Sequence, residues 1–123
     1  MPSSKNSPLC ARSASSPMGD PAKAQAMDYV KRYEAMYGPG TVSAFGAYTW
    51  DAGLLLSQSI PVALKTAQPG TREFRAALRD ALEAVHDLKV SNGVINMSKN
   101  DHLGLDQRAR VIVRIVGGKW KLD

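Results

Sequence analysis

Cysteine is nearly absent from the sequence. Cys10 is the single cysteine among 123 residues, which excludes an intrachain disulfide and a zinc site built on several cysteines. Redox chemistry therefore does not indicate a compartment. No G-x-G-x-x-G, P-loop or nucleophile-elbow pattern occurs either. The sequence indicates no enzyme active site and no cofactor, and we expect a protein without enzymatic activity.

A secretory signal is also missing from the first residues. Lys5 and Arg12 are not followed by an apolar segment, and Leu9-Cys10 does not follow the hydrophobic run of a lipoprotein signal. Residues 1–19 are instead rich in serine and proline. Such a segment cannot bury enough apolar surface to offset its ordering entropy. We therefore expect a disordered lead-in over residues 1–19 and one folded domain over residues 20–123.

Positive charge is in small excess, with a net charge of +5. Most of this excess lies in residues 108–123, which contain five Lys and Arg residues and one acidic residue, Asp123. An excess of this size allows weak attraction of anions but identifies no partner.

One long apolar stretch, residues 44–64, has the length of a membrane span. Asp51 is its single charged residue, and near the centre of a span it would oppose insertion by roughly 2.5–3.5 kcal/mol. Apolar side chains cover nearly the whole circumference, so the stretch is typical of a helix buried on several sides. We expect a core helix and no membrane span, with Pro61 kinking or ending its regular part.

Amphipathic helices are expected on both sides of this stretch. Asp20-Pro21 is a typical helix start, and helical spacing of apolar residues predicts a helix over residues 21–37. Thr71 is a plausible N-cap of a third helix that ends at about residue 84 or 85.

After the third helix the period of the pattern changes. Residues 93–97 read as a short strand and residues 98–104 as a polar turn. Residues 108–116 alternate, and Gly117-Gly118 joins them to residues 119–122 in a two-residue hairpin. With Val116 opposite Lys119, one half-buried face of the hairpin would carry five apolar side chains: Val111, Val113, Ile115, Trp120 and Leu122.

These few extended residues are a small surface for so apolar a helix. A lone hairpin is marginal in water. Leaving a few hundred Å² of apolar surface uncovered costs the fold several kcal/mol of hydrophobic stabilisation, at about 25 cal/mol per Å². We expect either an oligomer or a part of a larger fold.

A set of short segments carries a resemblance that runs in order from Asp20 to the C-terminus. Among them is the aromatic-Asp-Ala-x-x-Leu pattern Trp50–Leu55. The full set is Asp28–Glu34, Tyr37–Gly40, Phe45–Leu56, Pro69–Glu83, Gly93–Ser98, Asp101-His102, Gly104–Asp106 and Gly118–Leu122. Together they resemble the C-terminal portion of branched-chain amino-acid-type periplasmic solute-binding proteins, the Leu/Ile/Val-binding-like proteins of ABC transporters.

The resemblance implies an α/β chain that forms an incomplete, C-terminal part of a type I periplasmic-binding-protein fold. It implies an amino acid or related small solute, an ABC permease as partner, and a periplasmic location for the full-length family. The family's N-terminal strands, which carry most solute contacts, have no counterpart here. No ligand-binding residue is therefore carried over, and the fragment is expected not to bind solute alone.

Two polar positions could suggest chemistry. A buried Asp51 needs hydrogen bonds, a cation or a proton, and we expect a structural partner, either a backbone N–H or an arginine, before a ligand contact. His102 lies near Asp101 and Asp106, but a metal site needs three or four ligands and His86 is distant in sequence. A polar turn is the favoured interpretation of this region.

Two further groups of side chains have alternative interpretations. Tyr48 and Trp50 are expected in the core before a ligand cleft. Arg110, Arg114 and Lys121 share one face of the hairpin. We interpret this as a solvated face without nucleic-acid contact. The alternative function is a small basic interaction module that contacts nucleic acid or an acidic partner through the hairpin.

Overall fold

The computed structural model describes residues 19–110 and 112–123, and this part of the chain combines three α-helices with two antiparallel hairpins. The set contains the expected three helices, a short strand and the C-terminal hairpin. The predicted lead-in, residues 1–19, falls outside the described residues except for Gly19. In chain order the elements are α2 (Lys23–Tyr37), α3 (Ala44–Ala63), α4 (Arg72–Glu83), β1 (Leu88–Val90), β2 (Gly93–Ile95), the 3₁₀ turn η2 (Gln107–Ala109), β3 (Val113–Val116) and β4 (Lys119–Leu122).

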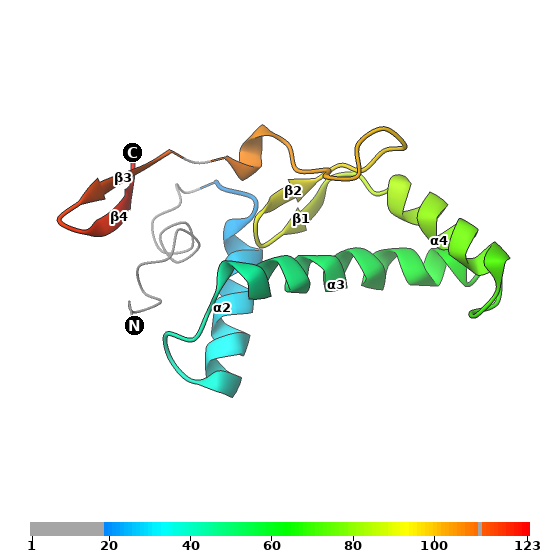
Figure 1. Ribbon diagram of the computed structural model, residues 1–123, viewed down its shortest axis with the longest axis horizontal. Helices are drawn as coiled ribbons and strands as arrows, with labels where there is room; N and C mark the ends of the chain where they lie inside the picture. Colours follow the sequence, from blue (N-terminus) through cyan, green and yellow to red (C-terminus); the bar gives the residue numbers. More distant parts are fainter. Residues whose placement is uncertain (1–18, 111) are drawn as a thin grey trace.

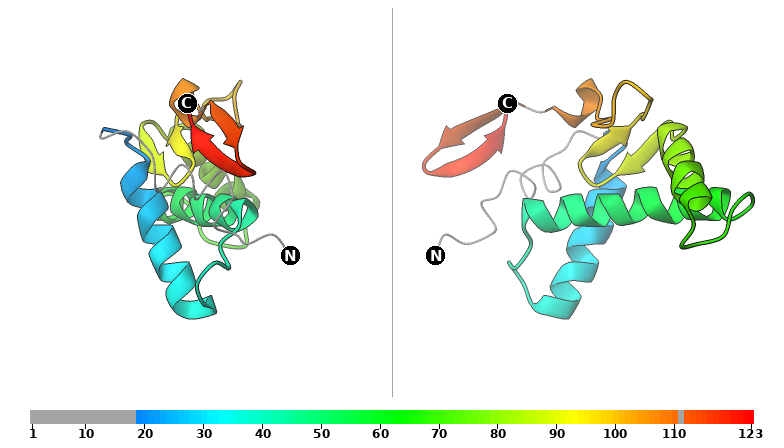
Figure 2. Two further views of the ribbon diagram at one scale, coloured as in Figure 1. Left: turned by 90° about the vertical axis from the view of Figure 1, so that its left-hand side faces the viewer. Right: turned by 45° about the vertical axis from the view of Figure 1, so that its right-hand side comes forward.

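Helix α3 is the element around which the others are arranged. Figure 1 shows α2 crossing it near its N-terminal end, the β1–β2 hairpin above it and α4 beside its C-terminal end. Hairpin β3–β4 stands apart from the helices in Figure 1 and in the right-hand view of Figure 2.

Side-chain caps fix the starts of two helices. The Ser43 hydroxyl accepts a hydrogen bond from the Gly46 N–H at 3.1 Å, and the Thr71 hydroxyl accepts one from the Phe74 N–H at 3.1 Å. The predicted cap at Thr71 is therefore confirmed. The predicted start at Asp20-Pro21 is two residues early, because the Asp20 carboxylate accepts from the Ala22 N–H in a turn that precedes α2.

The sequence pattern missed strand β1. It pairs with β2 so that Leu88 lies opposite Ile95 and Val90 lies opposite Gly93. Three residues are too few to show alternation. Strand β2 is also shorter than predicted, because from residue 96 onwards the chain turns and Ile95 bridges to Leu105.

The hairpin β3–β4 has the predicted register. Val113 lies opposite Leu122 and Val116 lies opposite Lys119. The predicted strand began five residues too early, since residues 107–109 form η2. The predicted half-buried face holds at Val113, which is partly buried, and is wrong at Ile115, which is 63% exposed, because the hairpin stands apart from the helices in Figure 1. Residue 111 and the side chains of Trp120 and Leu122 lie outside the described residues.

The expectation that α3 is buried on several sides is not met by the described residues. Its buried residues are small or polar, namely Ala47, Asp51, Ser59 and Ala63. Several of its large apolar residues are exposed, and Phe45 is 83% exposed. The neighbours α2, α4 and β1 contact only part of its circumference. Pro61 lies inside the helix, two residues before its last residue.

A small core fixes the crossing of α2 and α3. Tyr29, Val42 and Ala47 are buried there, with Val30, Tyr33 and Trp50 packed around them. None of the helices formed by the described residues combines the length and apolarity needed to cross a membrane.

We predict that Gly46→Ala destabilises the fold. A Cβ at Gly46 would lie 2.3 Å from the Tyr29 Oη, and this ring cannot move away easily because it is buried between Tyr33 and Trp50. The overpacking should lower the free energy of unfolding by about 1–3 kcal/mol, measured by urea denaturation. Gly53→Ala is the matched control, since a Cβ there meets nothing within 4 Å. Equal stability of Gly46→Ala and the wild type would contradict the prediction.

Candidate functional site

An apolar groove of about 650 Å³ lies between α2 and α3. Its α2 side is a ladder of tyrosines spaced four residues apart, which places them on one helix face. Ring centroids are 5.5 Å apart for Tyr29 and Tyr33 and 4.7 Å apart for Tyr33 and Tyr37. Trp50 of α3 joins the ladder at 5.9 Å from Tyr29. The groove is lined by Tyr29, Arg32, Tyr33, Met36, Tyr37, Gly46, Thr49, Trp50, Gly53, Leu54 and Ser57.

Arg32 is the charged residue of this lining. Its guanidinium carbon lies 5.8 Å from the centre of a Trp50 ring, within the range of a cation–π contact worth about 0.5–1 kcal/mol at an exposed site. The same guanidinium donates to the Asp28 carboxylate at 2.9 Å, one helical turn away. The charge of Arg32 is thus already compensated by residues of the chain.

Asp51 is held by the turn between β1 and β2. One carboxylate oxygen accepts the Ser91 N–H at 2.7 Å. The other accepts the Asn92 N–H at 3.1 Å and the Asn92 side-chain amide at 2.8 Å. Asp51 and Ser91 are both buried, so three donors satisfy a charge that burial would otherwise penalise. The expectation of a backbone partner for Asp51 is confirmed.

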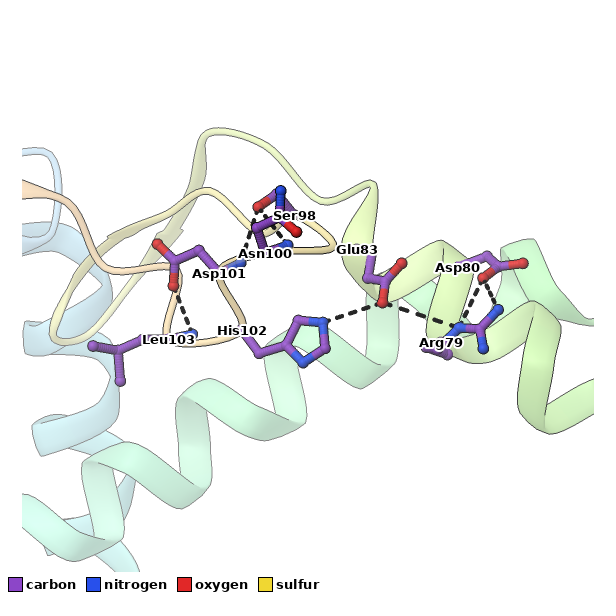
Figure 3. A network of polar contacts seen from close by, with 8 residues as sticks. All are labelled: Arg79, Asp80, Glu83, Ser98, Asn100, Asp101, His102 and Leu103. Carbon is purple, nitrogen blue, oxygen red and sulfur yellow. Dashed lines mark hydrogen bonds and ion pairs between the residues drawn. The ribbon is translucent and has the colours of Figure 1, made fainter.

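His102 joins a surface network with α4 (Figure 3). Its Nε2 lies 3.1 Å from the Glu83 Oε1, and the Arg79 Nε lies 4.0 Å from the same oxygen. Asp101 accepts the N–H groups of Leu103 and Gly104, as expected for a polar turn. No cluster of three or more possible metal ligands occurs among the residues that the structure describes.

Asp106 belongs to a different network from His102. It accepts hydrogen bonds from the side chains of Asn96 and Arg108. The Arg108 guanidinium lowers the pKa of the Asp106 carboxyl below its ordinary value. A lowered folded pKa means that this pair contributes stability above the ordinary pKa and loses it as the pH falls. The sequence neighbours His102, Asp101 and Asp106 therefore do not form one site.

The other side chains for which the sequence allowed alternative interpretations are mostly exposed. Tyr48 is 55% exposed, so its expected core position is wrong for the described residues. Trp50 is half-buried in the groove wall. Arg110, Arg114 and Lys121 are exposed, and Arg114 is paired with Asp123. The groove itself was not predicted from the sequence, because the spacing of Tyr29, Tyr33 and Tyr37 shows only that these side chains share one face of α2.

Solved structures resemble most of this chain. An extracellular ligand-binding receptor from Rhodopseudomonas palustris is 38% identical, with a TM-score of 0.82 over 94% of this chain and 32% of the receptor. A receptor of the same description from strain HaA2 is 36% identical, with a TM-score of 0.82 over 94% of this chain and 32% of the receptor. The chain is homologous to extracellular ligand-binding receptors.

This homology covers only part of the receptors. The chain spans about a third of the length of the receptors that it matches. The match agrees with the expected α/β part of a periplasmic-binding-protein-like fold. No family model matches the sequence, and no curated protein matches it.

We predict that Asp51→Asn destabilises the receptor-like fold. An asparagine replaces one acceptor oxygen by an NH₂ group, which then faces an N–H donor of the Ser91-Asn92 turn. The loss should be about 1–3 kcal/mol in the free energy of unfolding. Hydrogen exchange of the Ser91 amide should become faster. Asp28→Asn, on an exposed ion pair, is the control and should change stability by less than about 1 kcal/mol. Unchanged exchange at Ser91 would contradict the role of Asp51.

Proposed function

We propose that the chain forms one portion of an ABC-importer solute-binding protein that carries an amino acid or a related small organic solute. The observation that carries the proposal is the match of most of this chain to extracellular ligand-binding receptors at 36–38% identity. The segments quoted above, from Asp28 to Leu122, support the branched-chain amino-acid type within that class. The location would be the periplasm and the partner an ABC permease.

The mechanism of such a protein is non-covalent. A cleft closes on the solute, and binding shifts the population from open to closed conformations. The contacts of Asp51 and His102 are those expected of residues that support the fold of such a protein. Asp51 uses its acceptors within the fold, and the His102 network lies on the surface. Neither the Asp51 cluster nor the His102 network requires a cofactor or a reaction.

The arrangement of α3 supports placing this chain inside a larger protein. Its small side chains are buried and several of its large apolar side chains are exposed, as expected if a further layer covers them in the complete receptor. A solute site in such proteins is concave and buries most of the ligand. The groove wall, by contrast, includes Tyr37, which is 59% exposed. We therefore expect the 123-residue chain to bind no solute by itself.

Calorimetry tests this expectation. Titration of the 123-residue chain with each of the twenty amino acids should give no saturable heat up to millimolar concentration. The matched control is a chimera in which the full chain replaces the matching third of the Rhodopseudomonas palustris receptor. The chimera should be monomeric, melt cooperatively and gain a higher Tm with at least one solute of the panel. Saturable one-to-one binding by the chain alone would contradict this expectation, and a chimera that does not fold would contradict the proposal.

A further inference from the structure

Gly53 occupies a position where the described residues do not require a glycine. It lies in the middle of α3, where glycine is less favourable than alanine because it loses more conformational freedom on folding. It is not among the positive-φ glycines, and a Cβ at this position would meet nothing within 4 Å. Gly46 of the same helix is different, since the Tyr29 hydroxyl would lie 2.3 Å from its Cβ. A close neighbour outside the described residues is the physical reason that remains for Gly53.

Gly53 also lines the apolar groove. Trp50 and Leu54 flank it on α3, and the opposite wall on α2 includes Met36 and Tyr37. Met36 is 74% exposed. A glycine between apolar walls lets a neighbouring backbone or bulky side chain approach the helix closely.

The occupant is macromolecular and apolar. Exposed large side chains continue along α3 beyond the groove, at Phe45, Tyr48 and Leu56, and a helix of 20 residues is about 30 Å long. A small solute would not cover that length. Arg32 already pairs with Asp28, so the groove has no uncompensated positive charge that calls for an acidic partner.

The receptors that match this chain are about three times as long as the matched region, so they have polypeptide from which such an occupant can come. The matched region is 32% of each receptor, so two thirds of the receptor polypeptide lie outside it. We infer that the α2–α3 groove is the docking site of an apolar segment from those two thirds, and that this segment approaches α3 closely at Gly53. The inference rests on the proposed function and adds to it the part of the receptor that covers the α2–α3 groove.

The test compares Gly53→Leu in two settings. In the 123-residue chain alone, the leucine should be tolerated, with an unchanged or higher Tm, because a Cβ at Gly53 meets no described atom within 4 Å and the rest of the side chain can enter the open groove. In the receptor chimera defined above, the same leucine should lower the Tm by about 3–10 °C, because it overpacks an occupied groove. Gly53→Ala should show the same signs with smaller shifts.

Ala76→Leu is the matched control, since Ala76 is exposed on α4 and does not line the groove. It should change the Tm little in either setting. A folded chimera that tolerates Gly53→Leu as well as Ala76→Leu would overturn the inference and leave the proposed function standing. A chimera that does not fold would count against the proposed function itself. If the chain alone forms a dimer that Gly53→Leu dissociates, the occupant is a second copy and the inference is wrong.

Discussion

The dominant physical constraint on this chain is the orientation of helix α3. Its contacts with α2, α4 and β1 use small or polar side chains such as Ala47, Ser59 and Ala63. Several of its large apolar side chains point elsewhere, which is the reverse of an ordinary amphipathic helix. If a few hundred Å² of such apolar surface stays in contact with water, the fold loses several kcal/mol of hydrophobic stabilisation, at about 25 cal/mol per Å². This loss is comparable with the whole stability of a small domain. The arrangement of the other elements follows from that choice of contact face.

Small residues on the contact face let the backbone of the β1–β2 turn approach α3 closely. Asp51 accepts hydrogen bonds from that backbone. Its carboxylate reaches across about forty residues of sequence to the Ser91-Asn92 turn. Because the acceptor is charged and its donors are mostly backbone, the bond fixes both the position and the orientation of the β1–β2 hairpin. The buried strand residues Val90 and Val94 then pack behind the turn. A single polar residue in an apolar helix thus connects the helical layer to the strands.

Features set by local chemistry could be read from the sequence, whereas features set by distant neighbours could not. The Thr71 cap, the position of helix α3 and the β3–β4 register depend on residues close in sequence, and these predictions were confirmed, whereas the predicted burial of α3 was not. The need of Asp51 for a partner was evident, but the identity of that partner depends on the packing of strand β1, which is too short to show a pattern. The groove depends on how two helices cross, which no period within either helix specifies.

The contacts that α3 makes with α2 and with the β1–β2 turn also fix the shape of the α2–α3 groove. The Gly46–Tyr29 approach acts where α3 meets α2, and the Asp51 bonds act where α3 meets the β1–β2 turn. The small core of Tyr29, Val42 and Ala47, together with the close approach of Tyr29 to Gly46, fixes the crossing of α2 and α3 that forms the walls of the groove. A surface that is ordered in advance loses less conformational entropy on association. Gly46, where Tyr29 of α2 approaches closely, and Gly53, where no described atom does, therefore have different physical reasons to be glycine, although both lie on one helix and line one groove.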